Sequence, residues 1–199
     1  MNAASQPLAL RDLALRRGPR LLFEGLELQL APGEVLHLQG ANGAGKTSLL
    51  ETLAGLRRAA EGAIDGRPEA GGLHWLGHRN ALNLNLSVLE NLEFWCGLNG
   101  VEPAACLPAL ERVGLARLRH RLVRTLSAGQ KRRAALARLL VSLRPLWLLD
   151  EPLDGLDRQG LELFAQLLAE HAARGGMAVV TSHQPLPPGL SGVRSLVLG

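Results

Sequence analysis

The sequence predicts an α/β protein with a mainly parallel sheet as its core, N-terminal antiparallel strands and a small helical subdomain. In the last third of the chain, short apolar runs alternate with helical patterns, which favours right-handed crossovers and helices on both faces of a sheet. A helix-rich stretch separates this region from the N-terminal strands. We therefore expect one domain, 1–199, with a core of 1–83 and 144–199 and a helical subdomain of about 84–143.

The N-terminal part is expected to form strands around a glycine-rich loop. Leu22, Leu26, Leu28 and Leu30 fall on one side of an alternating segment, which is typical of a half-buried strand. The expected elements are strands at 8–15, 21–30 and 35–39, a helix over 46–55, and a strand within 72–78.

Helical signals dominate the middle of the chain. Ser87 and Glu90 have the spacing of a capping box, which predicts a helix from 87 to about 98. Further helices are expected at 104–113 and 128–143. The latter should bury one face, because its leucines recur at helical spacing. Those leucines are Leu136, Leu139, Leu140 and Leu143.

The C-terminal part has the pattern of a buried parallel sheet. The apolar run Leu146–Leu149 is short and continuous, as in a strand covered on both faces. A helix is expected at 157–174, followed by strands at 177–181 and 193–198.

The composition excludes several classes of protein. Apolar residues make up 47% of the 199 residues, which argues against disorder. Aromatic residues make up only 3%, so a stacking platform for single-stranded nucleic acid is disfavoured. No run of about 18 apolar residues is present, so we expect no membrane span. Residues 1–17 lack the pattern of a secretory signal. Cys96 and Cys106 fit no metal-binding spacing and are expected to be free thiols in a reducing compartment.

The positive charge is concentrated in one segment. The net charge is +4, but residues 117–144 hold eight Arg, one Lys and no acid, which leaves 13 basic and 18 acidic residues elsewhere. Such a segment could bind nucleic acid or a membrane surface. We favour the plainer interpretation that most of these arginines are solvated or paired with the acidic remainder.

The segment 40–47 matches the pattern G-x4-G-K-[ST], with an apolar strand before it and a helix after it. In such a loop, successive backbone N–H groups and a helix N-terminus hold phosphates. Lys46 would reach the β- and γ-phosphates, and the Thr47 hydroxyl would ligate Mg²⁺. A plain glycine-rich turn is the alternative, but one of only two lysines lies at the required place. The predicted nucleotide-binding residues here are Gly40, Ala41, Asn42, Gly43, Ala44, Gly45, Lys46 and Thr47.

Two acids end the buried run at 146–149. We expect this strand to lie beside the strand that enters the glycine-rich loop, which would aim Asp150 at the metal. Glu151 could then orient the attacking water as a general base. Two solvated surface acids are the alternative interpretation.

Twenty residues before Asp150 stands the segment Leu126-Ser127-Ala128-Gly129-Gln130. Here the chain resembles the nucleotide-binding subunits of ABC transporters, a family of P-loop NTPases, over about residues 8–198. LSAGQ is similar to the LSGGQ signature, with Ala128 replacing the first glycine. The segment 153–157 resembles the D-loop, and His183 resembles the switch histidine.

This resemblance implies a dimer of two copies that sandwich two ATP molecules. Ser127, Gly129 and Gln130 would contact the nucleotide held by the other copy. Glu151, His183 and Lys46 would be catalytic, with Thr47 and Asp150 holding Mg²⁺. Arginines near this interface would lie close to two polyanions.

Two positions depart from the family pattern. His78 occupies the place of the Q-loop glutamine, and an imidazole is a softer Mg²⁺ ligand than an amide oxygen. His78 is therefore the weakest of the three metal candidates. The alternatives are coupling to a membrane subunit and a half-exposed position at the end of a strand. Residues 16–18 replace the usual adenine-stacking aromatic, and an arginine plane could stack there instead.

Finer resemblance points to one transport system. LSAGQ, Gly77-His78 and the segment 181–186 together resemble the ATP-binding subunit of the haem exporter of cytochrome c maturation. This implies an integral membrane partner and a peripheral place on the cytoplasmic face of the bacterial inner membrane. ATP hydrolysis would drive release of the haem-loaded periplasmic chaperone. Nucleic acid would not be a partner.

Three alternatives to the haem system stay open. The first is the ATPase subunit of another small ABC transporter with a different cargo. The second is an ABC-type ATPase acting on DNA or ribosomes, which a single P-loop without long heptads disfavours. The third is a non-catalytic regulatory module, which the presence of the complete set of predicted catalytic residues disfavours.

Overall fold

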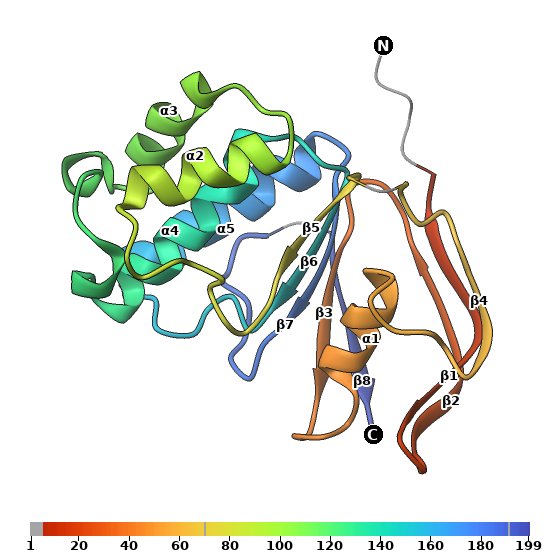
Figure 1. Ribbon diagram of the computed structural model, residues 1–199. Coiled ribbons are helices and arrows are strands. Elements are labelled where there is room, and N and C mark those ends of the chain that lie inside the picture. Colours follow the sequence, from red (N-terminus) through yellow and green to blue (C-terminus); the bar gives the residue numbers. More distant parts are fainter. Residues whose placement is uncertain (1–5, 70, 191) are drawn as a thin grey trace.

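The computed structural model describes residues 6–69, 71–190 and 192–199 (Figure 1). Residues 1–5, which belong to the segment examined for a secretory signal, lie outside this range. Among the described residues the strands form two sheets. None of the described helices is long and apolar enough to cross a membrane.

The larger sheet has five parallel strands in the order β5-β6-β7-β3-β8. Each strand is short, and β6 and β7 are buried along their whole length. The predicted parallel core is therefore confirmed. The strands are β3 (Val35–Gly40), β5 (Leu73–Leu76), β6 (Leu146–Asp150), β7 (Met177–Thr181) and β8 (Val193–Leu198).

The predicted position of β6 next to β3 in the parallel sheet is wrong. We expected β6 beside β3, but β7 pairs with both and separates them. The strands β6 and β7 are equally apolar, so the sequence predicts their burial without predicting their order in the sheet.

The smaller sheet is antiparallel, with the order β2-β1-β4. Its first two strands match the prediction. The third strand is missed, because Glu61–Asp65 has little apolar patterning and is defined by its pairing with β1. The strands are β1 (Leu8–Arg17), β2 (Arg20–Leu30) and β4 (Glu61–Asp65).

The parallel sheet is covered on both faces because alternate side chains of a strand point in opposite directions. In β6, Leu146 and Leu148 pack into the core shared with the antiparallel sheet and α1 (Lys46–Leu53). Trp147 and Leu149 pack instead against the other layer. That layer contains α4 (Ala128–Val141) and α5 (Arg158–Ala173), which lie on the opposite side of the sheet from α1 (Figure 1).

A third apolar cluster joins the helices of the middle of the chain. Helix α2 (Val88–Leu98) begins with the predicted capping box at Ser87. The helix expected at 104–113 is shorter: a 3₁₀ turn, η1 (Pro103–Ala105), leads into α3 (Cys106–Arg112). Two further 3₁₀ turns are η2 (Ala116–Leu118) and η3 (Val123–Thr125).

The cysteines and the end of α4 complete this region. Cys96 and Cys106 are buried free thiols, as predicted, with their sulfur atoms 3.4 Å apart. Helix α4 ends at Val141, and Leu143 is 81% exposed, so its predicted burial is wrong. Ser142 takes an extended conformation because the chain must leave the helix to enter β6, and Pro145 follows shortly after.

Candidate functional site

A polar hollow of about 310 Å³ lies at the carboxyl ends of β3 and β6. It brings together segments far apart in the sequence. The predicted residues Lys46, Thr47, Asp150, Glu151 and His183 all line it. Further lining residues are Arg17, Leu22, Asn42, Gly43, Gly45, Ser48, His78 and Asp154.

Sequence reasoning missed Leu22 and Ser48 as part of this hollow. The alternating pattern places Leu22 on the apolar side of a strand, and only the packing of β2 against the loop brings it to the hollow. Arg17, by contrast, falls in the segment where we expected a replacement for the adenine-stacking aromatic.

The loop between β3 and α1 needs glycine at two positions for steric reasons. At Gly40 a Cβ atom would lie 2.4 Å from the carbonyl oxygen of Leu198, and at Gly45 it would lie 3.1 Å from the ring of Phe23. Gly45 also precedes α1 with φ 105°, a conformation that side chains disfavour. The loop is therefore tightly packed between β8 and β2.

Lys46 is 8% exposed, and its ammonium group is held on the loop itself. Its Nζ donates hydrogen bonds to the carbonyl oxygens of Gly40 at 2.6 Å and Ala41 at 3.2 Å. Three carboxylates line the same hollow, those of Asp150, Glu151 and Asp154. The hollow therefore carries charges of both signs, which suits a phosphate and a divalent cation together.

A chain of hydrogen bonds orients the carboxylate of Asp150. Thr47 Oγ1 donates to one carboxylate oxygen at 3.0 Å, and Thr181 Oγ1 donates to the other at 2.7 Å. The backbone N–H of Glu151 donates to the same Thr181 oxygen at 2.9 Å. Thr181 thus links the two adjacent acids, although the sequence analysis assigned it no function.

Glu151 has an unusual backbone conformation, with φ 48°. Such left-handed geometry at a bulky residue is uncommon and is often found at functional sites. Its carboxylate accepts a hydrogen bond from the backbone N–H of His183 at 3.1 Å. The imidazole Nε2 of His183 lies 3.4 Å from the other carboxylate oxygen. The predicted pair of Glu151 and His183 is therefore brought into contact.

Thr47 and Asp150 form a donor set that fits a magnesium ion. Both supply oxygen atoms, which Mg²⁺ prefers, and they lie in direct contact. The described residues contain no cluster of three His, Cys, Asp or Glu side chains that could hold a metal. A Mg²⁺ ion at Thr47 and Asp150 would take these protein oxygens together with phosphates and water.

His78 lies at the exposed rim of the hollow. Its Nδ1 is 3.9 Å from a carboxylate oxygen of Asp154, and its side chain is 71% exposed. Its nearest acidic neighbour is therefore in the D-loop segment.

The signature segment caps α4. Ser127 Oγ accepts a hydrogen bond from the N–H of Gln130, and the Gln130 side chain accepts one from the N–H of Ser127. A Cβ atom on Gly129 would lie 2.8 Å from the carbonyl oxygen of Gly155, whereas the Ala128 methyl group is accommodated. This explains why an alanine can replace the first glycine of the signature but not the second.

None of Ser127, Gly129 and Gln130 is among the described residues that line the hollow. These residues therefore sit outside the phosphate site of their own chain.

Two arginines of the basic segment differ from the plainer interpretation, which concerns most of its arginines and not all of them. Arg132 and Arg138 of α4 are only 2% and 7% exposed, so they are not solvated. Burial lowers the pKa of Arg132, and the acids Asp154, Asp150 and Glu151 oppose this. Burial lowers the pKa of Arg138 to about 10, with Arg132 adding to the effect. Both guanidinium groups instead hydrogen bond to backbone carbonyls of the protein interior.

The family model described as ABC transporter matches residues 23–154. The chain therefore belongs to the ABC transporter family. Individual members of the family are similar to this chain over most of its length. It is 50% identical over 182 residues to the "Cytochrome c biogenesis ATP-binding export protein CcmA" of Rhodopseudomonas palustris (strain BisB5), covering 88% of this chain and 91% of the relative. The protein of the same name from Chelativorans sp. (strain BNC1) is 45% identical over 199 residues, covering 96% and 98%.

Solved structures give the same fold. A candidate ABC transporter ATP-binding protein from Pyrococcus furiosus superposes with a TM-score of 0.84 at 26% identity, covering 97% of this chain and 98% of that one. A dimeric ATP-binding cassette bound to ADP and Pi superposes with a TM-score of 0.77 at 24% identity, covering 89% and 88%.

Proposed function

We propose that this chain is the ATP-binding and ATP-hydrolysing subunit of a bacterial ABC transporter complex for haem export in cytochrome c biogenesis. The observation that carries the ATPase part is the meeting of Lys46, Thr47, Asp150, Glu151 and His183 in one hollow. The names of the relatives at 45–50% identity support the assignment to cytochrome c biogenesis.

The residues divide the work of ATP hydrolysis. Lys46 and the backbone N–H groups of residues 40–47 bind the phosphates. Thr47 and Asp150 would hold Mg²⁺, which neutralises charge on the phosphates when bound. Glu151 accepts a proton from the attacking water, and His183 holds the Glu151 carboxylate through its backbone N–H. Thr181 fixes both acids from β7.

We propose a dimer in which each copy completes the site of the other. Two observations support it: the signature residues Ser127, Gly129 and Gln130 do not line their own hollow, and α4 offers its N-terminus as an anion site. The dimeric state of a structural neighbour with the same fold agrees with this arrangement.

The partner of this dimer is proposed to be an integral membrane subunit of the cytochrome c maturation system. The chain would then lie peripherally on the cytoplasmic face of the bacterial inner membrane. We further propose a single domain, with a core of 1–83 and 144–199 and a helical subdomain of about 84–143. The separate apolar cluster of α2, α3 and α4 supports this division.

The proposal is tested by replacing the chain in cells with its Glu151→Gln form. We expect haem attached covalently to c-type cytochromes to disappear, because transport loses its energy source. A matched control is Glu170→Gln, which removes one acid from the exposed face of α5.

The two parts of the proposal fail in different ways. If attached haem is unchanged while the purified variant has lost ATP hydrolysis, the chain powers a transporter with another cargo. If the purified wild-type chain, alone and with its membrane partner, neither binds nor hydrolyses ATP, the ATPase assignment is wrong.

A further inference from the structure

We propose that Arg132 is a positioning residue that holds the catalytic turn at Glu151 and ties it to the loop at residues 77–80. This inference rests on the proposed ATPase function, because it concerns the geometry of the proposed general base. Arg132 is in the signature helix α4, and its guanidinium does not line the hollow.

Every N–H group of the Arg132 guanidinium has an acceptor. An arginine side chain carries five such donors. Three consecutive carbonyl oxygens receive one bond each: Asp150 at 3.1 Å, Glu151 at 2.6 Å and Pro152 at 3.0 Å. The remaining two bonds go to the Gly77 carbonyl oxygen at 3.2 Å and to Asn80 Oδ1 at 2.9 Å.

The first three bonds explain how an unfavourable backbone conformation is maintained. In an extended chain, successive carbonyl groups point in opposite directions. Three consecutive carbonyl oxygens of such a chain could not all accept hydrogen bonds from one guanidinium group. The left-handed φ of 48° at Glu151 turns the chain and lets them converge on Arg132. The conformation that aims the Glu151 carboxylate at His183 is thus the one that Arg132 stabilises.

The other two bonds connect this turn to the loop after β5. The same loop carries His78, whose imidazole lies at the rim of the hollow beside Asp154. Arg138, six residues further along α4, also donates to the carbonyl oxygen of Asn80 at 2.8 Å. A displacement of residues 77–80 would therefore pull on Arg132 and disturb the turn at Glu151.

Only an arginine fits this arrangement. The planar guanidinium presents five donors in a fixed fork, whereas a lysine ammonium has three donors at one point. Burying this charge at 2% exposure is costly unless it is fully hydrogen bonded, and here it is. Asp150, Glu151 and Asp154 compensate for its charge.

The test uses the full-length chain and its Arg132→Met variant, which keeps an unbranched apolar stem but removes the guanidinium and all its donors. We expect amide hydrogen exchange to accelerate by about tenfold or more in peptides covering 77–81 and 150–154, because both are held by the lost bonds. Peptides from β1 and β2 should exchange as in the wild type. This readout does not depend on ATP hydrolysis.

Steady-state kinetics give a second readout. For Arg132→Met we expect kcat for ATP hydrolysis to fall about 100-fold through misplacement of Glu151, with KM changed by less than about threefold. Arg132→Lys keeps the positive charge and is expected to keep the fold. Its kcat should fall by a similar factor, because an ammonium group cannot reach all five acceptors at once. Asn80→Ala should loosen 77–81 while leaving 150–154 closer to the wild type.

The neighbouring Arg133→Met variant is the matched control, since the Nε of Arg133 has no hydrogen-bond partner among the described residues. It should leave both exchange and kcat near wild-type values. Unchanged exchange in 77–81 and 150–154, acceleration spread evenly over the chain, or full activity of Arg132→Lys would each overturn the proposal. If wild-type hydrolysis itself is absent, the proposed function fails and hydrogen exchange still decides the structural link.

Discussion

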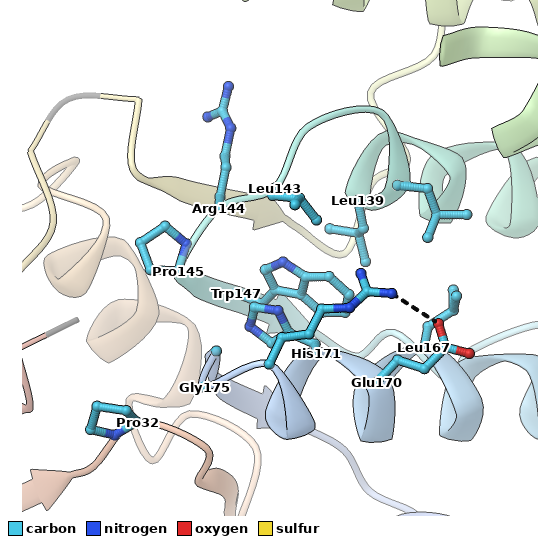
Figure 2. A pocket seen from close by; sticks show the side chains of 13 residues that line it. Pro32, Leu139, Leu143, Arg144, Pro145, Trp147, Leu167, Glu170, His171 and Gly175 are labelled. Carbon is cyan, nitrogen blue, oxygen red and sulfur yellow. Dashed lines mark ion pairs between the residues drawn. The ribbon is translucent and has the colours of Figure 1, made fainter. Parts of the chain in front are cut away.

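The two ends of β6 border hollows of opposite character. At the carboxyl end, Asp150 and Glu151 enter the polar hollow of about 310 Å³. At the amino end, Pro145 and Trp147 line a larger hollow of about 460 Å³, shown in Figure 2. Its wall is mostly apolar, with Leu139, Leu143 and Leu167 among its residues.

Charges are used differently at the two ends. Around the apolar hollow, Arg174 pairs with Glu170 (Figure 2), and Arg144 donates to the carbonyl oxygen of Leu73. The charges of Arg174 and Glu170 are thus paired with each other, and the Arg144 guanidinium is bound to the backbone. At the carboxyl end, Lys46 at the start of α1 and the adjacent acids Asp150 and Glu151 at the end of β6 line one open space. The gathering of restrained polar groups, and not the size of a hollow, is therefore the reason for proposing the carboxyl end as the site of ATP hydrolysis.

The largest expected effect is at the polar end. Glu151→Gln should lower ATP turnover by about 10²–10⁴-fold, because the proposed general base is lost while the size and shape of the side chain are kept. Nucleotide binding should persist, since Lys46 and the loop are intact. Turnover is measured with the purified chain and its partner, with Glu170→Gln as the control from the other end of the sheet. A comparable loss of ATP turnover in Glu170→Gln would contradict the proposal that only the carboxyl end of β6 takes part in hydrolysis.

Thr181→Val should weaken the same end less severely. The Glu151 N–H loses its acceptor and the Asp150 carboxylate loses a donor, at a cost of about 1–3 kcal/mol for each buried group left unpaired. Urea unfolding and ATP turnover should both decline. Thr52→Val serves as control, because the buried Thr52 hydroxyl bonds only within α1. Equal losses in both variants would contradict a special function of Thr181.

At the apolar end the expected effect is on pH dependence. Burial lowers the pKa of His171 to about 4, and its ring stacks on Trp147 with centroids 3.9 Å apart. Below the ordinary value of 6.5 the unfolded chain binds a proton that the folded chain refuses. His171 therefore lowers the unfolding free energy as the pH falls from 6.5 towards 4, by no more than about 3 kcal/mol.

The His171→Phe variant tests this effect. Phenylalanine keeps a ring on Trp147 but cannot titrate, so the unfolding free energy should fall less steeply with decreasing pH than in the wild type. His74, whose pKa burial also lowers to about 4, stays in both chains. His171 is the last and smallest cause of the His74 shift, so the difference between the two pH curves reports mainly on His171. Parallel pH curves from urea unfolding would show that His171 does not titrate as the structure indicates.

Leu143→Ser should have the smallest effect. Leu143 lines the apolar hollow but is 81% exposed, so its replacement should change the unfolding free energy by less than about 0.5 kcal/mol. ATP turnover should not change. A loss of turnover would mean that the apolar end takes part in the reaction cycle.

The sequence predicts much of this molecule because the relevant signals are local. The glycine loop at 40–47, the acids at 150–151 and the capping box at Ser87 are each encoded within a few residues. The alternation of β6 between two apolar clusters follows from strand geometry.

Tertiary structure decided what depends on distant neighbours. The apolar runs predict buried strands, but only packing places β7 between β3 and β6. Pairing with β1 creates β4 from a weakly patterned segment. Nothing in the local sequence tells that Arg132 faces three carbonyl groups while neighbouring Arg133 does not, since both belong to one basic run. Residue type and spacing determine which chemistry is available, whereas long-range hydrogen bonds and packing decide which of several similar residues position it.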